Sequence, residues 1–252
     1  MKKRTSSKLI CLIFLCFNLE AGANKLSIVI DDLGYNFEKG RRAIDLSAKV
    51  TLAILPFAPE ATRLSSYARK RGRETIIHLP MEAESAEGST QERITLTSKM
   101  SPIQYKIILR AALKKLGTPT GLSNHMGSLL TQQYRPMLQI MSEMANNNLY
   151  FLDSKTINQS AALKAAQKTG IRYLSRDYFL DNLQTIENME QVLKKAIKLS
   201  RKKGSAVVIA HPYNSSLSFL EDALRNLPKD IQLVYASHLA IRRPGKPDPQ
   251  GN

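Results

Sequence analysis

The sequence predicts an α/β fold, a single-domain distorted (β/α) barrel with about seven or eight mainly parallel strands. Short β-branched runs alternate along the 252 residues with longer stretches of helical period, and several of these stretches end in glycine just before the next run. No linker rich in Pro, Gly or Ser separates them, which favours one domain. An open doubly wound sheet is the alternative, because the number of strands does not establish closure.

Residues 1–23 have the pattern of a Sec-type signal peptide. Four basic residues precede Leu9, an apolar run extends to Phe17, and Ala21-Gly22-Ala23 supplies small residues at cleavage spacing. An uncleaved anchor is the alternative, but the run is much shorter than the roughly 20 residues that span a bilayer. We therefore expect an exported protein of the periplasm or cell envelope.

Cleavage changes the charge and the thiol content of the chain. The full chain has 37 Lys and Arg residues, of which four lie in residues 1–23, and 21 Asp and Glu residues, of which one lies there. The mature chain therefore keeps 33 basic and 20 acidic residues, and its net charge falls from +16 to +13. Cys11 and Cys16 also lie there, which leaves the mature chain without a disulfide. Its composition, 43% hydrophobic and 23% charged, excludes wholesale disorder, a collagen-like repeat and a multi-span membrane protein.

Eight β-branched or apolar runs are the predicted strands, and amphipathic helices lie between them. Apolar residues recur at helical spacing at Met137, Ile140, Met141 and Met144, and again at Ile186, Met189, Leu193 and Ile197. Four helices are expected to stop at a glycine that follows basic residues, namely Gly72, Gly117, Gly170 and Gly204. The predicted strands are 26–30, 50–55, 75–79, 121–125, 149–153, 171–175, 206–210 and 231–235.

One long insertion and one tail interrupt this pattern. The insertion, residues 83–99, is acidic at first and is expected to form a loop over a site. The tail, residues 243–252, contains three prolines and is expected to be flexible. The predicted domain therefore covers residues 24–242.

Unusual polar residues follow the predicted strands at their carboxyl ends, the face on which parallel α/β folds build active sites. Taken alone, an Asp pair after a strand is a common helix cap and a single His is a common structural residue. Together, a carboxylate and two imidazoles from different strands match a three-ligand zinc site with an open position for water. The residues are Asp31, Asp32, His78, Asn124, His125, Asp153, Asp177, Asp181 and His211.

The chemistry that such a site supports is hydrolysis. A divalent metal lowers the pKa of bound water, and an adjacent carboxylate can take the proton as that water attacks a carbonyl. The pair Asp31 and Asp32 suits this division between ligand and general base. His211 is placed to protonate a departing amine or to stabilise an oxyanion.

At these residues the chain resembles the divergent polysaccharide deacetylases of bacterial envelopes. The resemblance implies a distorted barrel of the carbohydrate esterase type, a divalent metal such as zinc, and removal of N-acetyl groups from a glycan. It is carried by six motifs in series: Ile30-Asp31-Asp32-Leu33-Gly34, His78-Leu79-Pro80-Met81-Glu82, Asn124-His125-Met126-Gly127-Ser128, Asp153-Ser154-Lys155-Thr156, the segment 176–182, and Ala210-His211-Pro212.

The same resemblance suggests roles for single residues. Asp31 would be the base and His211 the acid, with Asp32, His78 and His125 as metal ligands. Mainstream members take both histidine ligands from one short motif, whereas here the residue four after His78 is a glutamate, and their Arg-x-Pro-Tyr motif is absent from this sequence. Candidates for substrate binding or orientation are Asn124, Ser128, Asp153, Asp177, Asp181 and Glu82, the last also a substitute ligand.

Two functions follow as hypotheses. The first is a metal-dependent hydrolase that acts on an acetylated glycan or peptidoglycan-like polymer, and the second is an inactive glycan-binding or scaffold protein on the same barrel. A charge of +13 favours anionic envelope polymers or lipid head groups as further partners. Nucleic acid is not expected, because no aromatic residues are interleaved with the basic stretches.

Overall fold

The computed structural model describes residues 24–46, 49–85, 92 and 94–243. The predicted signal peptide, residues 1–23, and nearly all of the predicted tail lie outside the described residues. In the part of the chain that is described, no helix is long and apolar enough to cross a membrane.

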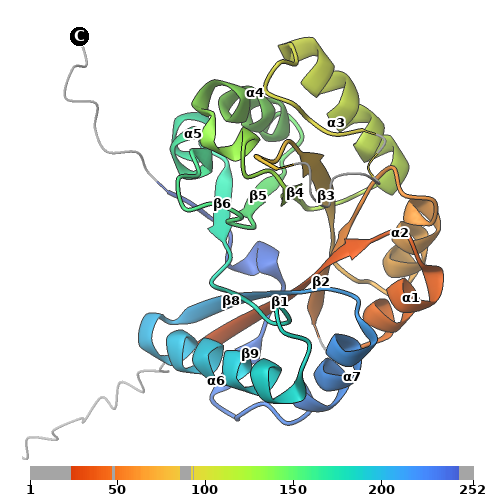
Figure 1. Ribbon diagram of the computed structural model, residues 1–252, viewed down its shortest axis with the longest axis vertical. Coiled ribbons are helices and arrows are strands. Elements are labelled where there is room, and N and C mark those ends of the chain that lie inside the picture. The colour runs from red at the N-terminus through yellow and green to blue at the C-terminus, as the bar shows by residue number, and fades with distance from the viewer. Residues whose placement is uncertain (1–23, 47–48, 86–91, 93, 244–252) are drawn as a thin grey trace, which may run out of the picture.

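The described strands form one sheet in the order β10-β6-β5-β4-β3-β2-β1-β8-β7, with β9 paired to β1 (Figure 1). All of these pairings are parallel except that of β10 with β6. Each of the eight predicted strands is present, and two short strands, β7 and β10, add to them. The strands are β1 Asn24–Leu33, β2 Val50–Ile54, β3 Thr75–Met81, β4 Gly121–Met126, β5 Tyr150–Asp153, β6 Arg172–Ser175, β7 Tyr178–Phe179, β8 Ser205–Ala210, β9 Ile231–Leu233 and β10 Ile241–Arg242.

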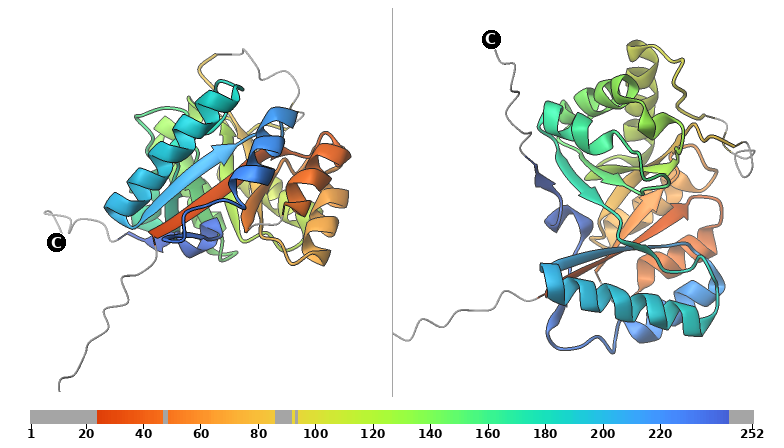
Figure 2. Two further views of the ribbon diagram at one scale, coloured as in Figure 1. Left: turned by 90° about the horizontal axis from the view of Figure 1, so that it is seen from below. Right: turned by 60° about the vertical axis from the view of Figure 1, so that its left-hand side comes forward.

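The sheet curls into a distorted barrel (Figure 2). Between β6 and β7 the barrel is joined only by the connecting segment, because these two strands do not pair with each other. The chain leaves β6 and enters β7 after two residues, yet β6 pairs with β5 whereas β7 pairs with β8. The amide of Arg176 donates to the carbonyl of Asp153, and the amide of Leu180 donates to that of Ile209, at 3.0 and 2.8 Å. The distortion of the predicted barrel therefore lies between β6 and β8.

Seven described α-helices pack around the outside of this curl (Figure 1). The predicted stripe on α4 is buried at all four positions, whereas the stripe on α6 is buried at Met189 and Leu193 but opens to solvent at Ile186. All four predicted stop glycines have positive φ angles. The helices are α1 Phe37–Asp45, α2 Ala61–Lys70, α3 Pro102–Leu116, α4 Tyr134–Ala145, α5 Ala162–Thr169, α6 Ile186–Lys203 and α7 Asn214–Ala223, with short 3-10 turns η1 Leu130–Gln132 and η2 Ala236–His238.

Alternation along the strands separates two cores. Ile28 and Ile30 of β1 belong to the larger cluster, which lies between the sheet and the helices, whereas Val29 belongs to a smaller cluster inside the curl. Ala236 of η2 joins that inner cluster at the amino-terminal end of the barrel, where its N–H donates to Oγ1 of Thr51 near the start of β2. Residues two positions beyond an inner apolar residue share its face, so Asp31 and His78 follow Val29 and Ile76 on the inner face.

Candidate metal centre

A bulge in β1 brings two adjacent carboxylates to one site. Ile30 pairs with Leu52 and Leu33 pairs with Ile54, so β1 advances by one residue more than β2 across this interval. Within the bulge Asp32 has a φ of 56°, a left-handed conformation that non-glycine residues rarely adopt. Without the bulge, Asp31 and Asp32 would point to opposite faces of the sheet, and with it both carboxylates reach the carboxyl end of the barrel.

Two imidazoles from β3 and β4 meet the second carboxylate. The Nε2 atom of His78 lies 3.1 Å from Oδ1 of Asp32, and Nδ1 of His125 lies 2.8 Å from the same oxygen. These two nitrogens are 3.3 Å apart. The other ring nitrogen of His78, Nδ1, is hydrogen bonded to Oγ of Ser123 at 2.7 Å, which fixes the ring with Nε2 toward Asp32.

The donor set fits a divalent metal. One atom each from Asp32, His78 and His125 lies within 4.8 Å of the others. Bonds of about 2.0–2.1 Å at tetrahedral angles would separate ligand atoms by about 3.3 Å, close to the spacing observed. Among the described residues, Oδ1 of Asp31 is also a buried side-chain oxygen that accepts no hydrogen bond. Buried carboxylate oxygens without donors are costly, and a cation would satisfy them.

Burial and neighbouring charge separate the two carboxylates. Burial raises the pKa of Asp31 above the usual range, an effect that His78 partly opposes. Burial also acts to raise the pKa of Asp32, but the imidazoles of His125 and His78 have a larger, opposite effect, so the net shift of this pKa is downward. Asp32 is thus held as an anion, the form that binds a metal, whereas Asp31 has a greater affinity for a proton.

A second pair faces this group across the site. Oδ1 of the buried Asp181 lies 2.9 Å from Nδ1 of His211, and Oδ2 accepts from the backbone N–H of His211 and from Oγ of Ser216. This arrangement directs Nε2 of His211 toward Oδ2 of Asp32, 4.0 Å away. Burial lowers the pKa of His211, but the bond to Asp181 and the other carboxylates more than offset this and raise it to about 9.

Asp181 and Asp177 were both candidates to orient His211, and the structure assigns this contact to Asp181. Asp177 instead pairs with the Lys203 ammonium and accepts from the backbone N–H of Val207. It therefore ties β7 to β8 away from the metal centre.

Other predicted site residues are not brought to the centre. Glu82 accepts from the N–H and the hydroxyl of Ser98, so it fixes the insertion instead of joining the ligand group. Asn124 bridges the backbone of Met126 and Ser154. Ser128 accepts from the N–H of Glu84.

Asp153 also lies away from the centre. Its neighbour Leu152 lies in the inner core, so alternation turns the Asp153 side chain toward the helices. There it accepts from the hydroxyls of Ser160 and Tyr173. Asp153 is therefore a structural residue that joins β5, β6 and the segment before α5.

Several residues of the site were not singled out from the sequence. Ser123 precedes His125 by two positions, and this shared strand face is a signal that could have identified it. Ser216, by contrast, has no sequence signal. Phe179 stacks on His211 with ring centroids 5.8 Å apart, and Tyr213 lies on the same imidazole at 5.7 Å.

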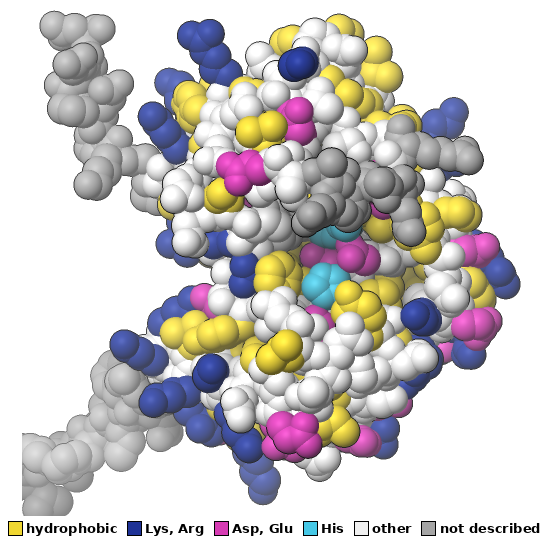
Figure 3. Space-filling view, in the orientation of Figure 1, with side chains coloured by type: hydrophobic (Ala, Val, Ile, Leu, Met, Phe, Trp, Pro, Cys, Tyr) yellow, Lys and Arg dark blue, Asp and Glu magenta, His cyan; other side chains and the backbone are white. Residues whose placement is uncertain are grey.

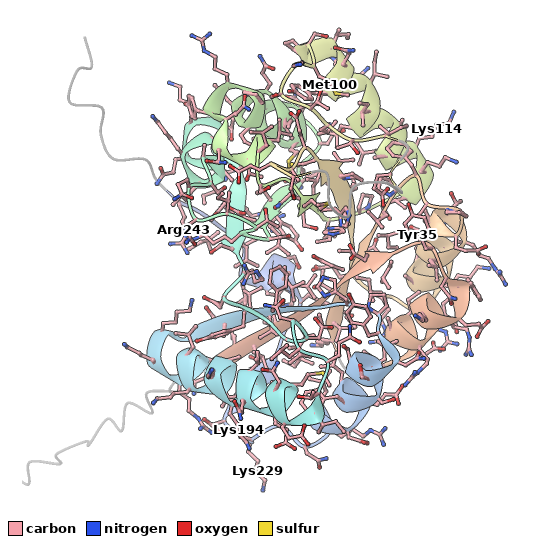
Figure 4. All side chains as sticks on the ribbon, in the orientation of Figure 1. Tyr35, Met100, Lys114, Lys194, Lys229 and Arg243 are labelled. Atoms are coloured by element: carbon pink, nitrogen blue, oxygen red, sulfur yellow. The ribbon has the colours of Figure 1, made fainter. Side chains whose placement is uncertain are left out.

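A cavity of about 480 Å³ adjoins the centre at His125. Figure 3 shows a hollow in which histidine and acidic side chains lie together, with hydrophobic side chains along its rim. The hydroxyl of Tyr35, labelled in Figure 4 on the loop after β1, donates to Glu92 at 3.0 Å. Glu82 lines this cavity together with Ala83, Glu84, Ser85, Glu92 and Thr95 from the described part of the insertion.

Solved structures share this fold. An uncharacterized protein from Agrobacterium tumefaciens C58 matches with a TM-score of 0.83 and 23% identity over 88% of this chain and 91% of that one. The Bc1960 peptidoglycan N-acetylglucosamine deacetylase matches with a TM-score of 0.57 and 12% identity, over 86% of this chain and 88% of that one. These structures confirm the predicted α/β barrel.

Sequence relatives extend over most of the chain. The uncharacterized protein YibQ of Escherichia coli (strain K12) is 37% identical over 217 residues, which are 86% of this chain and 67% of that protein. An uncharacterized protein of Haemophilus influenzae is also 37% identical, over 86% of this chain and 76% of that protein. The sequence model for divergent polysaccharide deacetylases matches residues 28–240, a range that contains every residue of the metal centre. The chain therefore belongs to the divergent polysaccharide deacetylase family.

Proposed function

We propose that this protein is a metal-dependent hydrolase that removes N-acetyl groups from an envelope polysaccharide or a related glycan. The observation that carries the proposal is the convergence of a three-ligand group, a buried carboxylate, and a histidine held by a buried aspartate at one end of the barrel. Amide hydrolysis needs an activated water, a base and an acid for the departing amine. Each of these needs has a matching residue in the site.

Asp32, His78 and His125 would hold the metal, for which we propose zinc because one carboxylate and two imidazoles are a zinc donor set. A bound divalent ion would supply Lewis acidity that polarises the amide carbonyl and favours ionisation of water at neutral pH. Oδ1 of Asp32 lies 3.1 Å from His78, and Ser123 holds that imidazole from behind. The protein thus presents these three side chains already oriented.

Asp31 is the general base in this proposal. Its Oδ2 lies 3.6 Å from Nε2 of His78 while its Oδ1 accepts no hydrogen bond among the described residues, so one oxygen is available for a proton. Burial raises its pKa, which makes it a stronger base than an exposed aspartate.

His211 is the general acid. With a pKa raised to about 9 it carries its proton at neutral pH, and Asp181 holds Nδ1 so that Nε2 faces the centre. It can therefore deliver a proton to the amine as the C–N bond breaks. The Bc1960 enzyme, which shares the fold, is a deacetylase of peptidoglycan N-acetylglucosamine, and this supports a glycan as the substrate class.

We further propose that the protein acts outside the cytoplasm. This rests on the basic start, the apolar run and the small residues of positions 1–23. Fractionation of cells that express the tagged full chain, with N-terminal sequencing of the product, tests it. A product that starts at Met1 in the cytoplasmic fraction would rule out export.

The proposed activity is tested by metal analysis and acetate release. Purified mature protein should contain about one divalent ion per chain and release acetate from chitin oligomers or peptidoglycan, and a chelator should stop the reaction. Asp31→Asn should abolish release with the fold intact, whereas Asp222→Asn, at a side chain that is 85% exposed, is the matched control. Acetate release that survives Asp31→Asn would refute the assigned base. Glycan binding without cleavage would establish the scaffold function instead.

A further inference from the structure

Tyr213 borders the metal centre but has no part in the chemistry assigned above. It directly precedes α7, two residues after His211, and its ring centroid lies 5.7 Å from that of the imidazole at an interplanar angle of 43°. Its side chain is only partly covered by the protein, since the residue is 39% exposed. An exposed aromatic ring thus stands beside the acid of the site.

Tyr213 is part of an aromatic wall. The His211 ring contacts both Tyr213 and Phe179, and the Phe179 ring is stacked on it at 5.8 Å and 29°. The Arg176 guanidinium lies over the Phe179 ring, 3.7 Å from its centroid. Of these three rings, Tyr213 is the exposed one, and hydrophobic side chains are seen along the rim of the hollow in Figure 3.

The wall is held by the network that holds the acid. The carbonyl of Tyr213 accepts from the N–H of Leu217 in the first turn of α7. Ser216, in the same turn, donates to Asp181, the partner of His211. The start of α7 and the catalytic pair are therefore fixed together, which makes the position of Tyr213 largely pre-formed.

We propose that Tyr213 binds the substrate by stacking against a pyranose ring of an N-acetylated glycan and so sets the preference of this site for sugars. A pyranose has an apolar C–H face and a polar rim, and a tyrosine offers a flat apolar face with a hydroxyl at its end. The ring lies beside His211, where the departing amine of that sugar would be. This inference rests on the proposed function for the identity of the ligand.

A fluorescence titration tests the stacking directly, because the chain contains no tryptophan. Tyr213→Trp introduces a single indole at the site, and its emission should change saturably when chitotetraose is added to the mature protein. Tyr235→Trp is the matched control, since Tyr235 precedes η2 at the amino-terminal end of the barrel, beside the start of β1. Its emission should not respond.

Affinity measurements then separate the roles of the ring. Tyr213→Ala should weaken chitotetraose binding and raise KM by about five- to tenfold, whereas Tyr213→Phe should stay within about twofold of the unchanged protein. Circular dichroism and a thermal melt establish that each variant is folded. An unresponsive indole, or equal affinity of the unchanged protein and Tyr213→Ala, overturns the inference. So does a fall in kcat with KM unchanged, which would mean that the ring acts through His211.

The two proposals fail in different ways. Binding that depends on Tyr213 but is never followed by acetate release leaves the stacking role in place and refutes the hydrolase. Acetate release with an unchanged KM in Tyr213→Ala leaves the hydrolase in place and refutes the stacking role.

Discussion

Oδ1 of Asp181 lies 2.9 Å from Nδ1 of His211, and its Oδ2 accepts the backbone N–H of the same histidine. One buried carboxylate thus fixes both the main chain and the ring of the residue that we assign as the acid. Its negative charge also stabilises the imidazolium, since the pKa of His211 is raised to about 9 although burial alone would lower it.

Replacing this carboxylate should move the pH profile. A general acid must be protonated, so activity falls as the pH rises through the pKa of His211 in the folded protein. In Asp181→Asn that pKa drops below about 9, and the alkaline limb of kcat/KM should shift to lower pH with a loss of about a hundredfold near pH 8. Asp177→Asn removes a carboxylate outside the centre and is the control. Coincident alkaline limbs in the two variants would show that Asp181 does not set the proton affinity of the acid.

Removal of the metal should destabilise the unchanged protein but not a ligand variant. A ligand present at a hundred times its Kd stabilises a fold by about 2.7 kcal/mol, so adding Zn²⁺ to chelated protein should raise Tm. Asp32→Ala removes the carboxylate that contacts both His78 and His125, so Zn²⁺ should no longer shift its Tm. Calorimetry with elemental analysis measures both effects. An equal Tm shift in Asp32→Ala would place the ion elsewhere.

The support behind His78 should tune metal affinity. Ser123→Ala removes the hydroxyl that fixes Nδ1 of His78, and loss of such a partner typically weakens binding by about tenfold to a hundredfold. Ser27→Ala is a close control, because Ser27 is another buried serine on a barrel strand and, in the described structure, its hydroxyl has no hydrogen-bond partner. Competition with a chromogenic chelator measures both affinities. Equal affinities would mean that Ser123 only packs beside the ring.

The sequence was sufficient for the strands and most of the helices because periodicity reports local burial directly. The eight predicted strands are all present, and the four stop glycines all have positive φ angles. How the sheet closes cannot be predicted from local periodicity, because closure depends on contacts between segments that are distant in the sequence. The passage from β6 to β7 depends on hydrogen bonds from Arg176 to β5 and from Leu180 to β8. These two strands are distant from the passage in the sequence and lie toward opposite ends of the strand order.

The sequence predicted which residue types form the site, but it did not predict which of the candidate side chains point into it. Asn124 and His125 are neighbours at the end of β4, but one bridges loop backbone and the other reaches Asp32. Strand alternation could have separated them. The bulge that brings Asp31 and Asp32 to the same face breaks that alternation, and no local pattern in the sequence announces it.

The turn after this bulge should be intolerant of any side chain at Gly34. Its φ is 139°, its carbonyl accepts from the N–H of Glu60, and a Cβ added there would lie 2.6 Å from Cβ of Ala58 and 3.2 Å from the carbonyl oxygen of Leu55. Gly34→Ala should therefore combine backbone strain with a clash and lower the free energy of unfolding by about 2–4 kcal/mol. Gly170→Ala, with a φ of 72° but nothing within 4 Å of the added carbon, carries strain alone and should cost about 1 kcal/mol.

Urea denaturation of the metal-free proteins compares the two variants, and equal losses of unfolding free energy would show that the contact with Ala58 relaxes without cost. Because Gly34 follows Asp32 by two residues, the same change should also weaken Zn²⁺ binding, which Gly170→Ala should not.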